Sequence, residues 1–174
     1  MGQIADMALT GGKLAMGYAE SLLKGVQASQ FARLAAPAGV IVKSNHPAWV
    51  YGHLAVYPGR CLELLGQPNT LNTPKHFDEL FKNGTACLDD PAGTIYPSMV
   101  EITKVYFDGY RAVLAALERA SDEAMLRANP GEGRLKELFP TCGAAVTFLI
   151  CGHQLIHFGQ ISAWRRMVGL PSAM

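Results

Sequence analysis

The stretch TCGAAVTFLICGHQLIHFGQISAWRRMV, from Thr141 to Val168, decides the fold. Its apolar residues return every three or four positions, which predicts one long helix with a buried face. The helix is expected to end at Val168, because Gly169 follows it and Pro171 cannot continue it.

Three other segments show helical periodicity, and we expect helices over Gln3–Gln27, Pro47–Leu65 and Ser98–Ala120. Residues 67–97 and 121–140 are left as loop-rich connections, the first of them unusually long. No segment alternates between apolar and polar residues for long enough to predict a strand. The chain is therefore predicted to be all-α.

Local signals predict details of these helices. The third helix should begin with a capping box, in which the Ser98 hydroxyl accepts from the backbone of Glu101. Pro58 should kink the second helix, because it lacks a backbone N–H. The buried stripe of the first helix is predicted to contain Ile4, Met7, Leu14, Tyr18 and Leu22.

Composition limits the functions to be considered. The 174 residues fit a single domain, 1–174, in which 49% of residues are apolar and 17% are charged. A net charge of +1 argues against nucleic-acid binding, which needs a clustered basic face. We find no signal peptide and expect no membrane partner. The four cysteines lack the spacing of a disulfide framework, so we expect a cytoplasmic protein with free thiols.

Three histidines carry the chemical signal. His153 and His157 are one helical turn apart on the apolar face of the last helix, and His53 lies on an apolar stripe of the second. A buried imidazole needs a partner for each ring nitrogen, and adjacent imidazoles compete for the same few partners. A divalent metal such as Zn, Ni, Fe or Mn would satisfy them, because neutral imidazole is a good ligand. Satisfied core histidines are the alternative.

The donor set predicts an open site. Gln154 stands where a zinc protease HExxH motif has its glutamate, so protease chemistry is not expected. The last helix contains no Asp or Glu, which removes the carboxylate pattern of di-iron bundles. Three histidine ligands would leave coordination positions for water or substrate, as in reactive metal sites.

Two segments of the sequence resemble the DinB-like superfamily. The first is Asn45-His46-Pro47-Ala48-Trp49 followed by Gly52-His53-Leu54. The second is His153-x-x-x-His157-x-Gly159-Gln160 followed by Arg165-Arg166 and Gly169-Leu170-Pro171. The similarity spans nearly the whole chain, including the two long connections.

The resemblance implies an up-up-down-down four-helix bundle with a long crossover connection. It also implies one divalent metal ion, bound by His53, His153 and His157, and a homodimer. Characterised relatives include S-transferases and isomerases that use mycothiol, bacillithiol or glutathione.

Three hypotheses follow for the function. The first is a metal-dependent S-transferase that activates a low-molecular-weight thiol for reaction with a small-molecule substrate, with metal-dependent hydrolysis as a variant. Tyr57 and Gln160 are candidate catalytic groups, and the aromatic residues Phe77, Phe81 and Tyr96 are candidates for the cofactor- or substrate-binding wall. The second is a non-catalytic metal- or ligand-binding bundle, and the third is a metal-free structural module.

Overall fold

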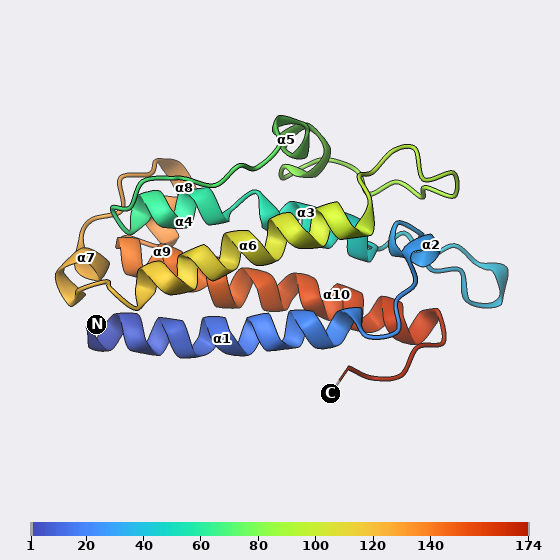
Figure 1. The fold of residues 1–174 in the computed structure, drawn as a ribbon, viewed down its shortest axis with the longest axis horizontal. Helices are drawn as coiled ribbons and strands as arrows, with labels where there is room; N and C mark the ends of the chain where they lie inside the picture. The colour runs from blue at the N-terminus through green and yellow to red at the C-terminus, as the bar shows by residue number, and fades with distance from the viewer. Residues whose placement is uncertain (1, 174) are drawn as a thin grey trace. The chain divides into compact units, whose positions relative to one another are not determined.

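The computed structural model describes residues 2–173, and every regular element among them is helical (Figure 1). One isolated β-bridge joins Ala128 and Thr141. The all-α prediction is therefore confirmed for this part of the chain. The helices are α1 (Gln3–Leu23), α2 (Ala28–Phe31), η1 (Pro37–Gly39), α3 (Pro47–Ala55), α4 (Pro58–Leu64), α5 (Lys75–Phe81), α6 (Met99–Leu117), α7 (Asp122–Leu126), α8 (Gly133–Leu138), α9 (Cys142–Thr147), η2 (Phe148–Gly152) and α10 (His153–Met167).

The contacts group the chain into two compact units. The first unit contains the residues up to Met16, together with 57–72 and 108–155. The second unit contains 17–56, 73–107 and the residues from Ile156 onward. The organisation as a single domain, 1–174, stays a prediction.

Most predicted helix boundaries are confirmed, because they depend on local chemistry. The Ser98 hydroxyl accepts from the Glu101 N–H at 3.2 Å, at the start of α6. Pro58 separates α3 from α4, as its missing N–H predicts. Gly66 and Gly169 follow the ends of α4 and α10 with φ of 72° and 81°, a conformation that favours glycine.

The predictions for α1 were wrong in two respects. The helix ends at Leu23 rather than Gln27, before a turn in which Gly25 has φ of 79°. Met7 and Leu14 are 78% and 69% exposed, and the buried face consists mainly of alanine: Ala5, Ala8, Ala15 and Ala19. A face of small residues lets a neighbour approach closely: a Cβ added to Gly11 would lie 2.6 Å from the Cys151 sulfur.

The predicted last helix contains a π-helical turn that the sequence analysis did not anticipate. Phe148–Gly152 form η2, and the His153 N–H bonds to the Phe148 carbonyl five residues earlier. A π turn inserts one residue into the helical register and is frequent at functional sites. The turn ends directly before His153, the first residue of α10.

One helical stretch, Cys142–Met167, is long and apolar enough to cross a membrane by length and composition. In its most apolar window 44% of the residues are buried within the protein. A buried core helix passes the same test. Val146, Ile150, Ile161 and Trp164, which lie in this stretch, are at most 1% exposed.

Candidate metal centre

Two of the three predicted ligands face each other within the second unit. The ring centroids of His53, on α3, and His157, on α10, are 4.7 Å apart. His53 is 2% exposed, and His157 is half-buried. The Trp49 indole stacks on the His53 ring at 4.7 Å with an interplanar angle of 8°. Trp49 lies one turn before His53 on α3, and its stacking restricts the rotation of the His53 ring.

His153 is the first residue of α10, one turn before His157 on the same helix. Within the first unit the Tyr57 ring meets it edge-on, with centroids 4.7 Å apart, and the Phe148 ring lies 5.7 Å from it. Since Phe148 begins the π turn and Tyr57 precedes Pro58, both breaks in helical regularity supply rings that contact this histidine.

The three histidines form a cluster that could hold a metal ion. Their ligand atoms all lie within 4.8 Å of one another. Two nitrogens on one zinc ion can lie at most about 4.2 Å apart, twice a bond of about 2.1 Å. Ligand atoms that lie farther apart than this would have to move closer together to share one ion. Three imidazoles suit Zn, Fe or Ni and leave positions open for other ligands.

Backbone and side-chain acceptors define the tautomers of two ligands. The Nδ1 of His53 lies 2.7 Å from the Phe81 carbonyl, which can only accept, so Nδ1 carries the proton. The Nδ1 of His157 lies 3.2 Å from Oε1 of Gln160, and this oxygen also accepts from the Asn45 amide at 3.0 Å. In both rings Nε2 is then the nitrogen with a lone pair. Such bonds orient the imidazole and increase its basicity toward a metal.

The electrostatics favour metal-binding imidazoles. Burial lowers the pKa of His53, and this effect outweighs the opposing hydrogen bond to Phe81. Burial also lowers the pKa of His157, against the hydrogen bond to Gln160. Both rings are therefore neutral at pH 7, which is the form that coordinates a cation.

The two candidate catalytic residues lie beside predicted ligands. Tyr57 contacts His153, and Gln160 accepts from His157, as described above. Each therefore has a structural role at the cluster, and participation in a reaction stays a prediction. The remaining histidines are elsewhere: His46 caps α3 by accepting from the Trp49 N–H, and His76 pairs with Glu101 at 3.5 Å.

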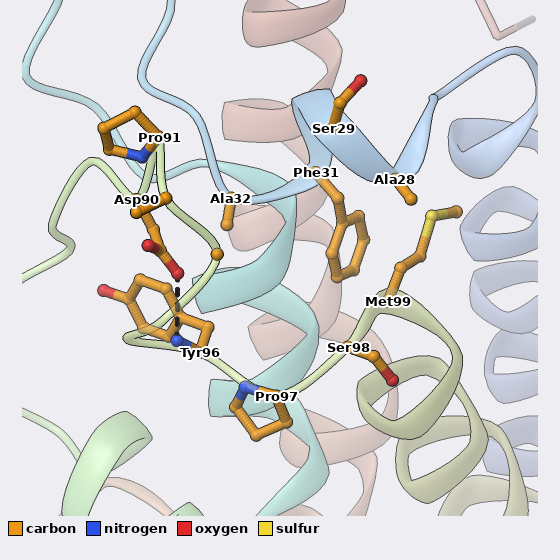
Figure 2. A pocket seen from close by; sticks show the side chains of 12 residues that line it. Ala28, Ser29, Phe31, Ala32, Asp90, Pro91, Tyr96, Pro97, Ser98 and Met99 are labelled. Atoms are coloured by element: carbon orange, nitrogen blue, oxygen red, sulfur yellow. Dashed lines mark hydrogen bonds between the residues drawn. The ribbon is translucent and has the colours of Figure 1, made fainter.

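The three aromatic candidates for a binding wall form a packed cluster. Phe77 and Phe81 are fully buried, 5.1 Å apart, and the ring of Tyr96 stacks on Phe81 at 5.7 Å. Phe77 and Phe81 belong to α5, which packs onto α3, so the cluster is part of the ordinary interior packing. Tyr96 lines a cavity of about 390 Å³ between α2 and the start of α6 (Figure 2). Whether any of the three contacts a cofactor or substrate stays a prediction.

Several residues support the candidate ligands in roles that the sequence analysis did not predict, although it named these residues for other reasons. They are Trp49 and Asn45, the carbonyl of Phe81, and Gly52, which precedes His53. A glycine inside a helix costs about 1 kcal/mol relative to alanine, so one beside a candidate ligand is a signal of close approach. Trp49 lies four residues before His53 on the same helix, a spacing that brings side chains together. The contacts of Asn45 with Gln160 and of the Phe81 carbonyl with His53 join residues distant in sequence and have no local signature.

Comparisons of the chain with protein-family models, with curated proteins and with solved structures found no match. The site therefore rests on its own geometry.

Proposed function

We propose that this protein binds one divalent metal ion through His53, His153 and His157, and that it is a DinB-like protein. The observation that carries the proposal is the convergence of three imidazoles, with ligand atoms within 4.8 Å of one another. The neutral rings of His53 and His157, in which hydrogen-bond acceptors assign the proton to Nδ1, support it.

The order of the helical segments along the chain supports the proposed bundle. Four long helical segments, α1, α3–α4, α6 and α9–α10, correspond to the four helices that the resemblance implies. The connection from α4 to α6 contains α5 and corresponds to the crossover. We propose the up-up-down-down topology on this basis.

We further propose that the reaction is thiol S-transfer to a small-molecule electrophile. A bound divalent metal supplies Lewis acidity, which lowers the pKa of a coordinated thiol. Tyr57 contacts the His153 ring and Gln160 accepts from His157, and we propose these two residues as the catalytic groups beside the ligands. The half-buried state of His153 and His157 is consistent with access for a small molecule.

Proteolysis and other carboxylate-assisted hydrolysis have less support. Gln154, which replaces the glutamate of HExxH, is fully buried, and its amide donates to the Ile150 carbonyl. It can neither ionise nor act as a general base. A non-catalytic metal-binding bundle is the remaining alternative.

Cobalt-substituted protein tests the proposed chemistry. Addition of glutathione or cysteine should produce a sulfur-to-cobalt charge-transfer band, because a thiolate would occupy an open position. The same titration on His157→Ala serves as the control and should give no band. If cobalt binds but neither thiol changes the spectrum, S-transfer is excluded for these thiols and the non-catalytic alternative is favoured.

We also propose a homodimer in the cytoplasm. Large apolar side chains are exposed on α1 and α10: Met7 and Leu14 are 78% and 69% exposed, and Leu155 and Ile156 are 44% and 61% exposed. Light scattering at micromolar concentration should give twice the chain mass of 18.7 kDa. The variant Leu14→Glu should shift the mass toward the monomer, and a monomeric wild type would contradict the proposal.

A further inference from the structure

The helix α5 contacts the histidine cluster through a backbone carbonyl. The Phe81 carbonyl, at the last residue of α5, accepts from Nδ1 of His53 at 2.7 Å. In Figure 1 α5 lies over α3, the helix that carries His53. The position of α5 therefore decides whether this hydrogen bond can form.

Gly52 is what allows α5 to come this close. A Cβ built on Gly52 would lie 2.5 Å from each of three carbons of the Phe81 ring. Carbon atoms do not approach to this distance, so a side chain at position 52 requires the ring to move.

The Phe81 ring is packed against other aromatic rings and has little room to move. It is fully buried, with Phe77 at 5.1 Å and the stacked ring of Tyr96 at 5.7 Å. Protein interiors are close-packed and have low compressibility. A ring displaced by a Cβ at position 52 would therefore shift the backbone of Phe81 as well. The carbonyl of Phe81 would then move away from His53.

We propose that Gly52 is a positioning residue for the metal site. By admitting the Phe81 ring it holds α5 where the Phe81 carbonyl keeps His53 in the Nδ1–H tautomer, so that Nε2 is the metal ligand. This inference rests on the proposed metal site. The interaction is of the kind whose removal lowers metal affinity about 10–100-fold.

The first test substitutes Gly52→Ala and measures Co²⁺ affinity by titration. We expect a loss of about 10–100-fold in a chain that keeps its helical circular dichroism. The matched control is Gly159→Ala, also in a helix and close to a ligand, where an added Cβ meets no heavy atom within 4 Å. Its affinity should be unchanged. Wild-type affinity in Gly52→Ala would overturn the inference.

A rescue separates positioning from a general loss of stability. In the double variant Gly52→Ala/Phe81→Ala the ring is gone but the backbone carbonyl remains. Its Co²⁺ affinity should recover to within a few-fold of wild type, although its melting temperature should fall below that of Gly52→Ala because a buried ring is lost. A double variant that binds as weakly as Gly52→Ala would overturn the inference.

The tautomer of His53 provides a readout without metal. Imidazole ¹⁵N spectra of the metal-free wild type should show His53 as Nδ1–H, and Gly52→Ala should lose this preference. A wild type that binds no Co²⁺ would refute the proposed function, while the spectra would still test the positioning by Gly52. Identical tautomers in the two proteins would overturn the inference, whatever the metal content.

Discussion

Substitution of Asp90 should lower the folding stability more than substitution of an exposed acidic residue of the second unit. Its carboxylate is 4% exposed and accepts three backbone N–H groups, from Thr94 at 2.9 Å, Ile95 at 3.0 Å and Tyr96 at 3.1 Å. Figure 2 shows the bond to Tyr96 at the edge of the cavity. The carboxylate thus stabilises the turn that places the Tyr96 ring against the Phe81 ring. The carbonyl of Phe81 in turn accepts a hydrogen bond from the candidate ligand His53.

The cost of Asp90→Ala can be worked from these contacts. The N–H of Tyr96 is buried, and leaving it without an acceptor costs about 1–3 kcal/mol. The N–H groups of Thr94 and Ile95 lie in exposed residues, where water can replace much of the bond. We expect a total loss of about 2–4 kcal/mol. For a chain of this size that corresponds to a fall in melting temperature of roughly 5–15 °C.

Urea denaturation followed by circular dichroism measures this loss. Asp90→Asn keeps one acceptor oxygen and should lose less than Asp90→Ala. The exposed Glu79→Ala is the control and should change stability by less than about 0.5 kcal/mol. A loss below about 1 kcal/mol for Asp90→Ala would refute the reasoning, since it would mean that the three N–H groups do not depend on the carboxylate.

The same site predicts a dependence on pH. Burial disfavours the charged carboxylate, but the backbone N–H groups of the turn outweigh it and lower the pKa of Asp90. Its stabilisation is therefore complete above the unfolded pKa, about 3.9, and is lost as the pH falls through the lower folded value. The stability difference between wild type and Asp90→Asn should be constant near neutral pH and shrink below about pH 4.

Three further predictions concern packing, a buried charge and the metal. Gly109→Ala should destabilise the protein by about 1–3 kcal/mol, because the new Cβ would lie 2.8 Å from the rigid ring of Pro58. The control Gly17→Ala, whose new Cβ meets no heavy atom within 4 Å, should be neutral or stabilising. Similar shifts in melting temperature for the two variants would contradict this prediction. Arg165→Lys should lower the free energy of unfolding by about 2–4 kcal/mol. Arg165 is 2% exposed, and its guanidinium donates to three backbone carbonyls that one ammonium group cannot all reach. An unchanged midpoint of chemical denaturation would refute this prediction. Stripping the metal with a chelator should lower the melting temperature while the helical dichroism at room temperature persists, and complete unfolding would show that the core alone is insufficient.

The features predictable from sequence were those encoded locally. Ser98, Pro58 and Gly169 mark helix boundaries through backbone chemistry within a few residues, and the structure has those boundaries. The four-residue spacing of His153 and His157 likewise places both on one face of a helix.

Features that depend on distant neighbours could not be predicted. The exposed Met7 was assigned to the core because apolar size was taken as the signal, whereas α1 buries its small residues to admit Cys151 beside Gly11. The contact between His53 and the Phe81 carbonyl joins residues 28 apart in sequence, and no local pattern specifies it. The π turn before His153 likewise matches none of the local patterns used to predict the helices.

The metal content of protein purified without an affinity tag tests the central claim most directly. Elemental analysis should find about one divalent ion per chain in the wild type and in His76→Ala, whose histidine is exposed and bonded to Glu101. His153→Ala should lose the ion on dialysis, because only two protein ligands would remain. A wild type without metal, or a His153→Ala variant with wild-type metal content, would contradict the account.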